Sequence, residues 1–248
     1  MTVVFVHGAP ETSDLWGPLR AVLDRETAAV SLPGFGTPRP SGFTGSKDAY
    51  AEWLARTLGG MNPPIDVVGH DFGALLTMRV ATALDVPLRS WVVDVPDIFH
   101  PRAEWPERVR RMQQPGVGEE MLSATRAYPA EDQRSAVSRL MGVGVPRDLA
   151  HSMGAAHDER MSQSILDFYR SAAPNVAADW WADITRPTPS RGLVLLLPDP
   201  PEIRALALEV AQRLGAETAD LGDLNHCWMA EAPQAVAPVL ERFWSSLA

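Results

Sequence analysis

The sequence is poor in cysteine and has no long apolar run. Its 248 residues include one cysteine, Cys227, which excludes an intramolecular disulfide and a metal site built from several thiolates. The longest apolar runs, such as residues 193–197, are far shorter than the roughly 20 residues that span a bilayer, so no membrane helix is expected. The chain begins directly with apolar residues 3–6, without a basic region or cleavage site. No signal peptide is therefore expected, and the cytoplasm is the default location.

Positive charge is also scarce. Lysine and arginine together number 22 against 31 acidic residues, which gives a formal net charge of −9. A negative chain repels nucleic-acid phosphates and anionic membranes, so neither is an expected partner. Hydrophobic residues at 46% and charged residues at 21% are typical of packed globular chains. The length fits one large domain, or a core with an inserted sub-domain.

Short β-branched segments alternate with amphipathic ones in the first and last parts of the chain. This alternation predicts a mostly parallel sheet covered by helices. The expected strands are residues 3–6, 28–32, 65–68, 91–95, 193–197 and 217–221. The expected helices start at the capping residues Ser13 or Asp14 and Ser46, and cover 74–84, 203–214 and 233–247. Between residues 97 and 190 methionine, alanine and arginine dominate, which favours a helical insertion.

A glycine-flanked aspartate follows the third expected strand. Gly69 and Gly73 stand two positions before and after Asp71, where that strand meets the next helix. This is the spacing of the nucleophile elbow, a strained turn in which glycine avoids side-chain clashes. The usual serine is replaced here by aspartate. The alternative is an ordinary turn in which Asp71 only caps the helix.

Two further segments meet the same edge of the expected sheet. The His-Gly-Ala-Pro segment at 7–10 follows the first strand, so the backbone amides of Ala9 and Phe72 could converge on one oxygen; a simple tight turn is the alternative. His226 follows the last strand, where a catalytic base would lie, although a lone histidine can be structural. Asp71, an acid and then His226 would give the chain order nucleophile, acid, base.

With these motifs the chain resembles the α/β-hydrolase superfamily, and within it the aspartate-nucleophile branch of epoxide hydrolases and haloalkane dehalogenases. Segments 32–36, 113–118 and 168–170 are also similar to parts of that branch. The resemblance implies an α/β-hydrolase core at 1–96 and 191–248, with helices on both faces of the sheet, and a helical cap at 97–190. The chain starts at what would be the third strand of the family. The first two strands would then be missing, or the start of the sequence would be placed late, and a sheet edge would be exposed.

The resemblance also implies catalytic roles. Asp71 would attack carbon, and His226 would activate the water that hydrolyses the resulting ester. The acid partner of His226 would be Asp199, which we favour, or else Asp94 or Asp97 at the position that many dehalogenases use.

A cap donor would protonate the epoxide oxygen. Tyr169 is the candidate, unless it only fills the seam between cap and core. Arg108 stands where epoxide hydrolases usually carry their second cap tyrosine.

The chemistry follows from aspartate in place of serine. A carboxylate needs no deprotonation to attack an sp³ carbon, whereas serine suits acyl carbons. An epoxide hydrolase acting on a small apolar organic substrate is therefore expected, with no cofactor and no metal, and with a homodimer allowed. Substrate contacts are expected from His7, Pro10, Trp180 and Trp181.

Two alternatives remain. A haloalkane dehalogenase would use the same aspartate and histidine, but the side chains of Ala9 and Phe72 offer no N–H to hold a halide. A hydrolase fold that has lost turnover would serve as a binding protein, although such a protein would not need Asp71, His226 and an acid together.

Overall fold

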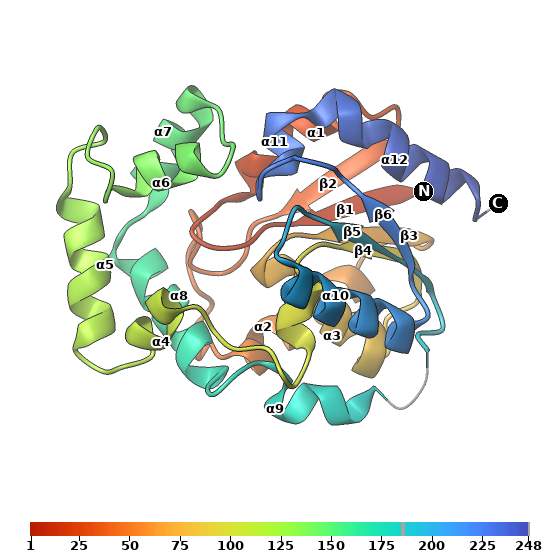
Figure 1. The fold of residues 1–248 in the computed structure, drawn as a ribbon, viewed down its shortest axis with the longest axis horizontal. Coiled ribbons are helices and arrows are strands. Elements are labelled where there is room, and N and C mark those ends of the chain that lie inside the picture. The colour runs from red at the N-terminus through yellow and green to blue at the C-terminus, as the bar shows by residue number, and fades with distance from the viewer. Residues whose placement is uncertain (185–186, 248) are drawn as a thin grey trace.

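The protein is built around one parallel sheet. The computed structural model describes residues 1–184 and 187–247, and its sheet has the strand order β2-β1-β3-β4-β5-β6 (Figure 1). Every neighbouring pair is parallel. The strands are β1 (Thr2–Val6), β2 (Glu26–Val30), β3 (Ile65–Gly69), β4 (Leu88–Val93), β5 (Arg191–Leu196) and β6 (Glu217–Asp220). The predicted α/β fold is confirmed.

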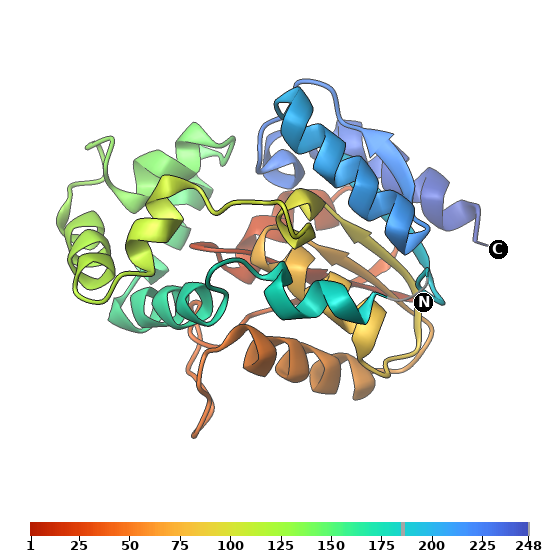
Figure 2. The ribbon, with the colours of Figure 1, turned by 60° about the horizontal axis from the view of Figure 1, so that its bottom comes forward.

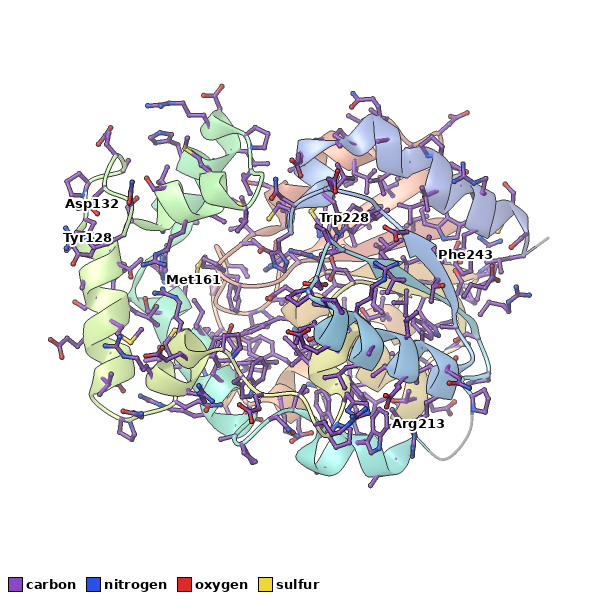
Figure 3. All side chains as sticks on the ribbon, viewed as in Figure 1. Tyr128, Asp132, Met161, Arg213, Trp228 and Phe243 are labelled. Atoms are coloured by element: carbon purple, nitrogen blue, oxygen red, sulfur yellow. The ribbon has the colours of Figure 1, made fainter. Side chains whose placement is uncertain are left out.

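Helices cover both faces of this sheet. One face packs against α2 (Lys47–Gly59), α3 (Phe72–Ala83) and α10 (Pro201–Leu214). The other packs against α1 (Gly17–Arg20), α11 (Trp228–Glu231) and α12 (Pro233–Ser245), and Figure 3 shows Trp228 and Phe243 on that side. Successive residues of β1 alternate between the two cores, as the twofold repeat of a strand requires: Val4 and Val6 face one, Val3 and Phe5 the other.

The first helix differs from the prediction. Thr12, rather than Ser13 or Asp14, accepts the capping hydrogen bond, from the Asp14 amide. The segment that follows is a 3₁₀ turn, η1 (Ser13–Trp16), and then the single turn of α1. Pro18 explains the break, because its ring nitrogen has no hydrogen to donate into the preceding turn.

β2 forms one edge of the sheet. Its residues are mostly half-buried, in contrast to the fully buried β3 at the centre. This agrees with the expected exposed edge. Among the residues the structure describes, no helix is both long and apolar enough to cross a membrane.

The chain between β4 and β5 is helical. It contains α4 (Glu107–Met112), α5 (Val117–Ala127), α6 (Ala136–Gly142), α7 (Arg147–Ala156), α8 (Glu159–Ser171) and α9 (Ala177–Trp180). Figures 1 and 2 show α4 to α8 grouped beyond the carboxyl ends of the strands, whereas α9 lies beside the core helices. The group therefore faces the edge of the sheet at which α/β proteins bind ligands.

Candidate active site

Asp71 occupies a strained turn between β3 and α3. Its backbone has φ +50° and ψ −117°, a region that residues other than glycine rarely adopt. The turn is tightly packed: a Cβ added to Gly73 would lie 2.2 Å from the Val6 carbonyl oxygen, and one added to Gly69 would lie 2.3 Å from the Gly73 oxygen. Both flanking positions therefore require glycine, as the nucleophile-elbow spacing predicts.

The two oxygens of the Asp71 carboxylate have different surroundings. Oδ1 accepts hydrogen bonds from the backbone amides of Ala9 at 3.0 Å and Phe72 at 2.7 Å. Oδ2 lies 3.8 Å from Nε2 of His226, in the loop between β6 and α11. The two amides thus converge on one oxygen, which belongs to Asp71 itself. The Phe72 bond also caps α3, so the capping role and the elbow geometry coexist in one residue.

The pKa of Asp71 is raised above its ordinary value. Burial is the main cause and the nearby Glu11 carboxylate adds to it, while His226, His70 and the Ala9 amide act in the opposite direction. The side chain is 20% exposed and that of His226 is 32% exposed, so both can be reached from solvent. A desolvated carboxylate that faces an imidazole is suited to nucleophilic attack.

A second histidine lies directly behind this pair. His70 is fully buried, with Nδ1 2.5 Å from Oδ2 of Asp94 and Nε2 3.5 Å from Oε1 of Glu11. Burial alone would lower the pKa of His70, but Asp94 and Glu11 outweigh it and hold that pKa well above its ordinary value. The His70 and His226 rings are 4.4 Å apart between centroids. A buried imidazolium thus offsets the negative charge around Asp71.

Both carboxylate oxygens of Asp94 accept hydrogen bonds. Besides its contact with His70, Oδ2 accepts from Trp228 Nε1 at 2.7 Å. Oδ1 accepts from the Asp71 backbone amide at 3.1 Å. Burial raises the pKa of Asp94, but the neighbouring imidazoles and the hydrogen bonds lower it overall. Asp94 therefore supports the turn that holds Asp71.

Three carboxylates are candidates for the acid partner of His226. Asp199 lies in the loop after β5. Burial raises the pKa of its carboxyl, and the nearby His226 acts in the opposite direction. Asp97 lies in η2 (Pro96–Phe99); burial, and then repulsion from Asp199, raises its pKa to about 6. Across residues 1–184 and 187–247, no hydrogen bond joins His226 to Asp94, Asp97 or Asp199. Asp199 remains the prediction, because Asp94 is held by His70.

A cavity of about 440 Å³ adjoins the site. Ala9, Pro10, Glu11 and His226 line it from the core side. All the other lining residues come from the helical segment between β4 and β5, and most of them are apolar. They are Arg108, Val109, Met112, Leu122, Thr125, Ala136, Arg139, Leu140, Gly142, Val143, His157, Ile165 and Tyr169. The volume suits a small organic molecule.

Tyr169 connects this cavity with the nucleophile. It is a nearly buried residue of α8, and its ring meets that of Phe72 edge-on at 5.0 Å. Burial, and then the Asp71 charge, raises its pKa well above the ordinary value for tyrosine. The phenol therefore keeps its proton over the whole neutral range.

The structure places three of the expected substrate contacts elsewhere. His7 is buried below the loop: its Nδ1 bonds the Gly8 carbonyl at 2.8 Å and its Nε2 accepts from the Leu32 amide at 3.1 Å. Trp180 is buried and donates to Asp48 at 2.8 Å. Trp181 packs on Arg213, which Figure 3 places on the opposite side of the molecule from Tyr128. None of the three lines the cavity in the described part of the chain, whereas Pro10 does.

Sequence reasoning missed three polar residues of the cavity, namely Glu11, Thr125 and Arg139. Glu11 directly follows the 7–10 segment, so its position was a usable signal. Thr125 of α5 and Arg139 of α6 lie in helical sequence without a motif. Only the grouping of the helices beyond the carboxyl ends of the strands brings them to the cavity.

Comparison with known proteins supports the same fold. The alpha/beta hydrolase family matches residues 3–239, so the chain belongs to this family. Among curated protein sequences, none matches. A proposed epoxide hydrolase from Pseudomonas aeruginosa has a similar structure, with 24% identity, a TM-score of 0.81 and coverage of 99% of this chain and 89% of that one.

Two other solved structures show how broadly the fold is shared. A loop variant of a haloalkane dehalogenase from Bradyrhizobium elkanii is 17% identical, with a TM-score of 0.73 over 99% of this chain and 89% of that one. MenH from S. aureus is 15% identical, with a TM-score of 0.73 over 100% and 94%. At these identities the likenesses establish the fold alone, and the reaction has to be inferred from the site.

Proposed function

We propose that the protein is an epoxide hydrolase that works through a covalent ester on Asp71. One observation carries the proposal: Oδ1 of Asp71 is held by two backbone amides, while Oδ2 faces His226 across 3.8 Å. This leaves one oxygen free to attack and keeps a base close to the ester that would form. In this proposal α4 to α8 act as a cap over the site.

In the first half-reaction, Oδ2 would form a bond to an epoxide carbon. The bond from that carbon to the ring oxygen breaks, and its electron pair stays on the oxygen. Tyr169 is the proposed donor of the proton that neutralises this alkoxide, because it lines the cavity and keeps its proton at neutral pH.

In the second half-reaction, His226 would take a proton from water as the water oxygen bonds to Cγ of Asp71. The Ala9 and Phe72 amides would hold the negative charge that develops on Oδ1. The bond between Cγ and Oδ2 then breaks as the His226 imidazolium returns its proton to Oδ2, and the diol leaves with the former Oδ2. The remaining proton of the water, now on the Asp71 carboxyl, would return to the Tyr169 phenolate and restore both groups. Asp199 is the proposed orienting acid of His226.

The same aspartate and histidine could displace a halide. Ala9 and Phe72, however, have no N–H in their side chains, and Trp180 is bonded to Asp48 rather than turned toward the cavity. The nearly buried tyrosine therefore favours an epoxide, whose oxygen needs a proton, over a halide, which does not.

A single-turnover experiment in ¹⁸O water tests the mechanism. With 1,2-epoxyhexane or styrene oxide as the probe and enzyme in excess, the label should enter Asp71 and be absent from the diol. Label in the diol after one turnover would instead mean direct attack of water on the epoxide. Parallel incubation with 1-bromohexane, scored for bromide release, distinguishes the halide reaction.

A His226→Ala variant tests the second half-reaction. It should form the ester and fail to hydrolyse it, so that intact mass spectrometry shows one adduct per chain, located on Asp71. His151→Ala is the matched control, because His151 is a histidine of α7 that does not line the cavity. If a substrate of the wild-type enzyme leaves no adduct on His226→Ala, the covalent route is wrong.

A further inference from the structure

Two arginines of the cavity have no acidic partner. Arg108 belongs to α4 and Arg139 to α6, and both line the cavity that Tyr169 and His226 also line. Within the described residues, neither forms an ion pair with a carboxylate. The only hydrogen bond of the Arg139 guanidinium there is from Nε to the Arg134 carbonyl at 3.2 Å.

Neighbouring arginines behave differently. Arg110, on the same helix as Arg108, pairs with Glu104 at 3.2 Å, and Arg170 of α8 pairs with Glu119 at 2.8 Å. Glu104 and Glu119 are thus paired with arginines outside the cavity. Arg108 is half-buried, and a guanidinium withdrawn from water normally has a counter-charge.

The electrostatics of the cavity agree with this geometry. Burial, and then the positive charge of Arg139, lowers the pKa of Arg108, so the two guanidiniums are close enough to repel. Burial, followed by Arg126 and Arg108, also lowers the pKa of the cavity residue His157 to about 4. On the core side Glu11 and Asp71 are negative, and His70 offsets them. The cap side of the cavity is therefore positive and lacks an anion.

We infer that the substrate carries a carboxylate, which Arg108 binds with support from Arg139 while the reacting carbon lies at Asp71. The planar guanidinium donates paired hydrogen bonds that match a carboxylate, and the apolar lining suits an aliphatic chain between the two ends. This inference rests on the proposed function for the reacting group only. It specifies the substrate class as an epoxide with an acid group.

Turnover of matched substrates gives the first test. We expect kcat/KM for 5,6-epoxyhexanoate and 7,8-epoxyoctanoate to exceed that for their neutral primary amides by roughly ten-fold to one-hundred-fold, the range of a hydrogen bond to a charged group. In Arg108→Gln the ratio of acid to amide should fall toward one, chiefly through KM, with only the smaller contribution of Arg139 left. Arg108→Lys should keep part of the preference, since it keeps the charge but loses the paired donors.

The matched control is Arg110→Gln. It removes one arginine from the same helix without touching the cavity lining, so the acid-to-amide ratio should stay at the wild-type value. Arg139→Gln should lower the ratio less than Arg108→Gln does, because Arg139 is the more exposed of the two. An equal loss of the ratio in Arg110→Gln would mean a general effect of surface charge.

Binding without turnover separates this inference from the proposed function. Isothermal titration of octanoate and octanamide into the wild-type chain should show tighter binding of octanoate, lost in Arg108→Gln and retained in Arg110→Gln. Equal binding of acid and amide, or a preference that survives Arg108→Gln, overturns the inference even if epoxides are hydrolysed. Arginine-dependent octanoate binding without hydrolysis of any epoxide supports the inference and overturns the proposed reaction.

Discussion

Nδ1 of His70 lies 2.5 Å from Oδ2 of Asp94. His70 directly precedes the candidate nucleophile Asp71, and Asp94 directly follows β4. The same carboxylate accepts the Asp71 backbone amide at 3.1 Å. Asp94 therefore holds both a buried imidazolium and the strained turn. Its contacts indicate a role in placing Asp71 rather than in orienting His226.

Asp94→Asn should destabilise the fold. The substitution leaves the His70 charge buried without its nearest counter-charge, and breaking one partner of a buried pair costs about 3–5 kcal/mol. Urea unfolding at pH 6 should show this loss. Asp85→Asn, an exposed position between α3 and β4, is the control and should change the free energy of unfolding by less than about 0.5 kcal/mol.

The cost of Asp94→Asn should depend on pH. The raised pKa of His70 means that its contribution is complete below the ordinary value of 6.5 and is lost as pH rises through the higher folded-state value. The lowered pKa of Asp94 means that its contribution is present above 3.8 and is lost as pH falls through the lower folded-state value. The difference between wild type and variant should therefore be largest between these limits. A difference that does not vary with pH would contradict the charged pair.

The sequence predicts the sheet and the elbow because both depend on local patterns. Alternating β-branched segments place the strands, and the spacing of Gly69 and Gly73 places the turn that holds Asp71. The His70–Asp94 pair depends on the neighbouring positions of β3 and β4 in the sheet, which no local pattern encodes. The expectation for Trp180 failed for a related reason: an aromatic pair near a cap boundary fits a pocket or a packed seam equally well, and here α9 packs beside the core.

Asp199→Asn should slow hydrolysis of the ester while leaving the fold intact. Asp199 is exposed and forms no buried pair in the described residues, so the free energy of unfolding should change by less than about 0.5 kcal/mol. Loss of the acid that orients His226 should instead allow the Asp71 ester to accumulate in rapid-quench experiments. Asp220→Asn, at the exposed end of β6, is the control for loss of one acidic residue. Wild-type ester hydrolysis in Asp199→Asn would assign the acid role elsewhere.

As the pH is lowered, the rate of Asp71 alkylation should begin to fall at a pH above the ordinary pKa of aspartate. Only the carboxylate attacks, and burial together with Glu11 raises the pKa of Asp71 above 3.8, so the active form is lost as pH falls through that raised value. The pH–rate profile of single-turnover alkylation, measured from pH 4 to 8, should show this decrease as its acidic limb. Glu11→Gln should move the acidic limb to lower pH, because it removes the negative charge beside Asp71. A limb that stays in place would mean that burial alone sets the pKa.

Tyr169→Phe should lower the rate of Asp71 alkylation by an epoxide. The ring oxygen leaves as a basic alkoxide, and a positioned proton donor is typically worth about 10²–10⁴-fold in rate. Tyr169 is suited to this role because it lines the cavity and its pKa is raised well above that of a free phenol. With Arg108 at the position expected for a second tyrosine, little redundancy remains. Rapid-quench mass spectrometry of the Asp71 adduct measures the rate.

Tyr128→Phe serves as the control, because Tyr128 follows α5 and does not line the cavity. In this variant Asp71 should be alkylated at the wild-type rate. If Tyr169→Phe also alkylates at that rate, the proton must come from another group of the cavity. His157 is then the first to examine, since its buried Nδ1 has no hydrogen-bond partner in the described residues; with a pKa of about 4 it would act at neutral pH as a neutral N–H hydrogen-bond donor to the ring oxygen. Loss of alkylation in Tyr169→Phe/His157→Gln but not in His157→Gln alone would show that the two donors substitute for each other. Unchanged alkylation in the double variant, together with bromide release from 1-bromohexane, would mean that the leaving group needs no proton and that the enzyme acts on halides.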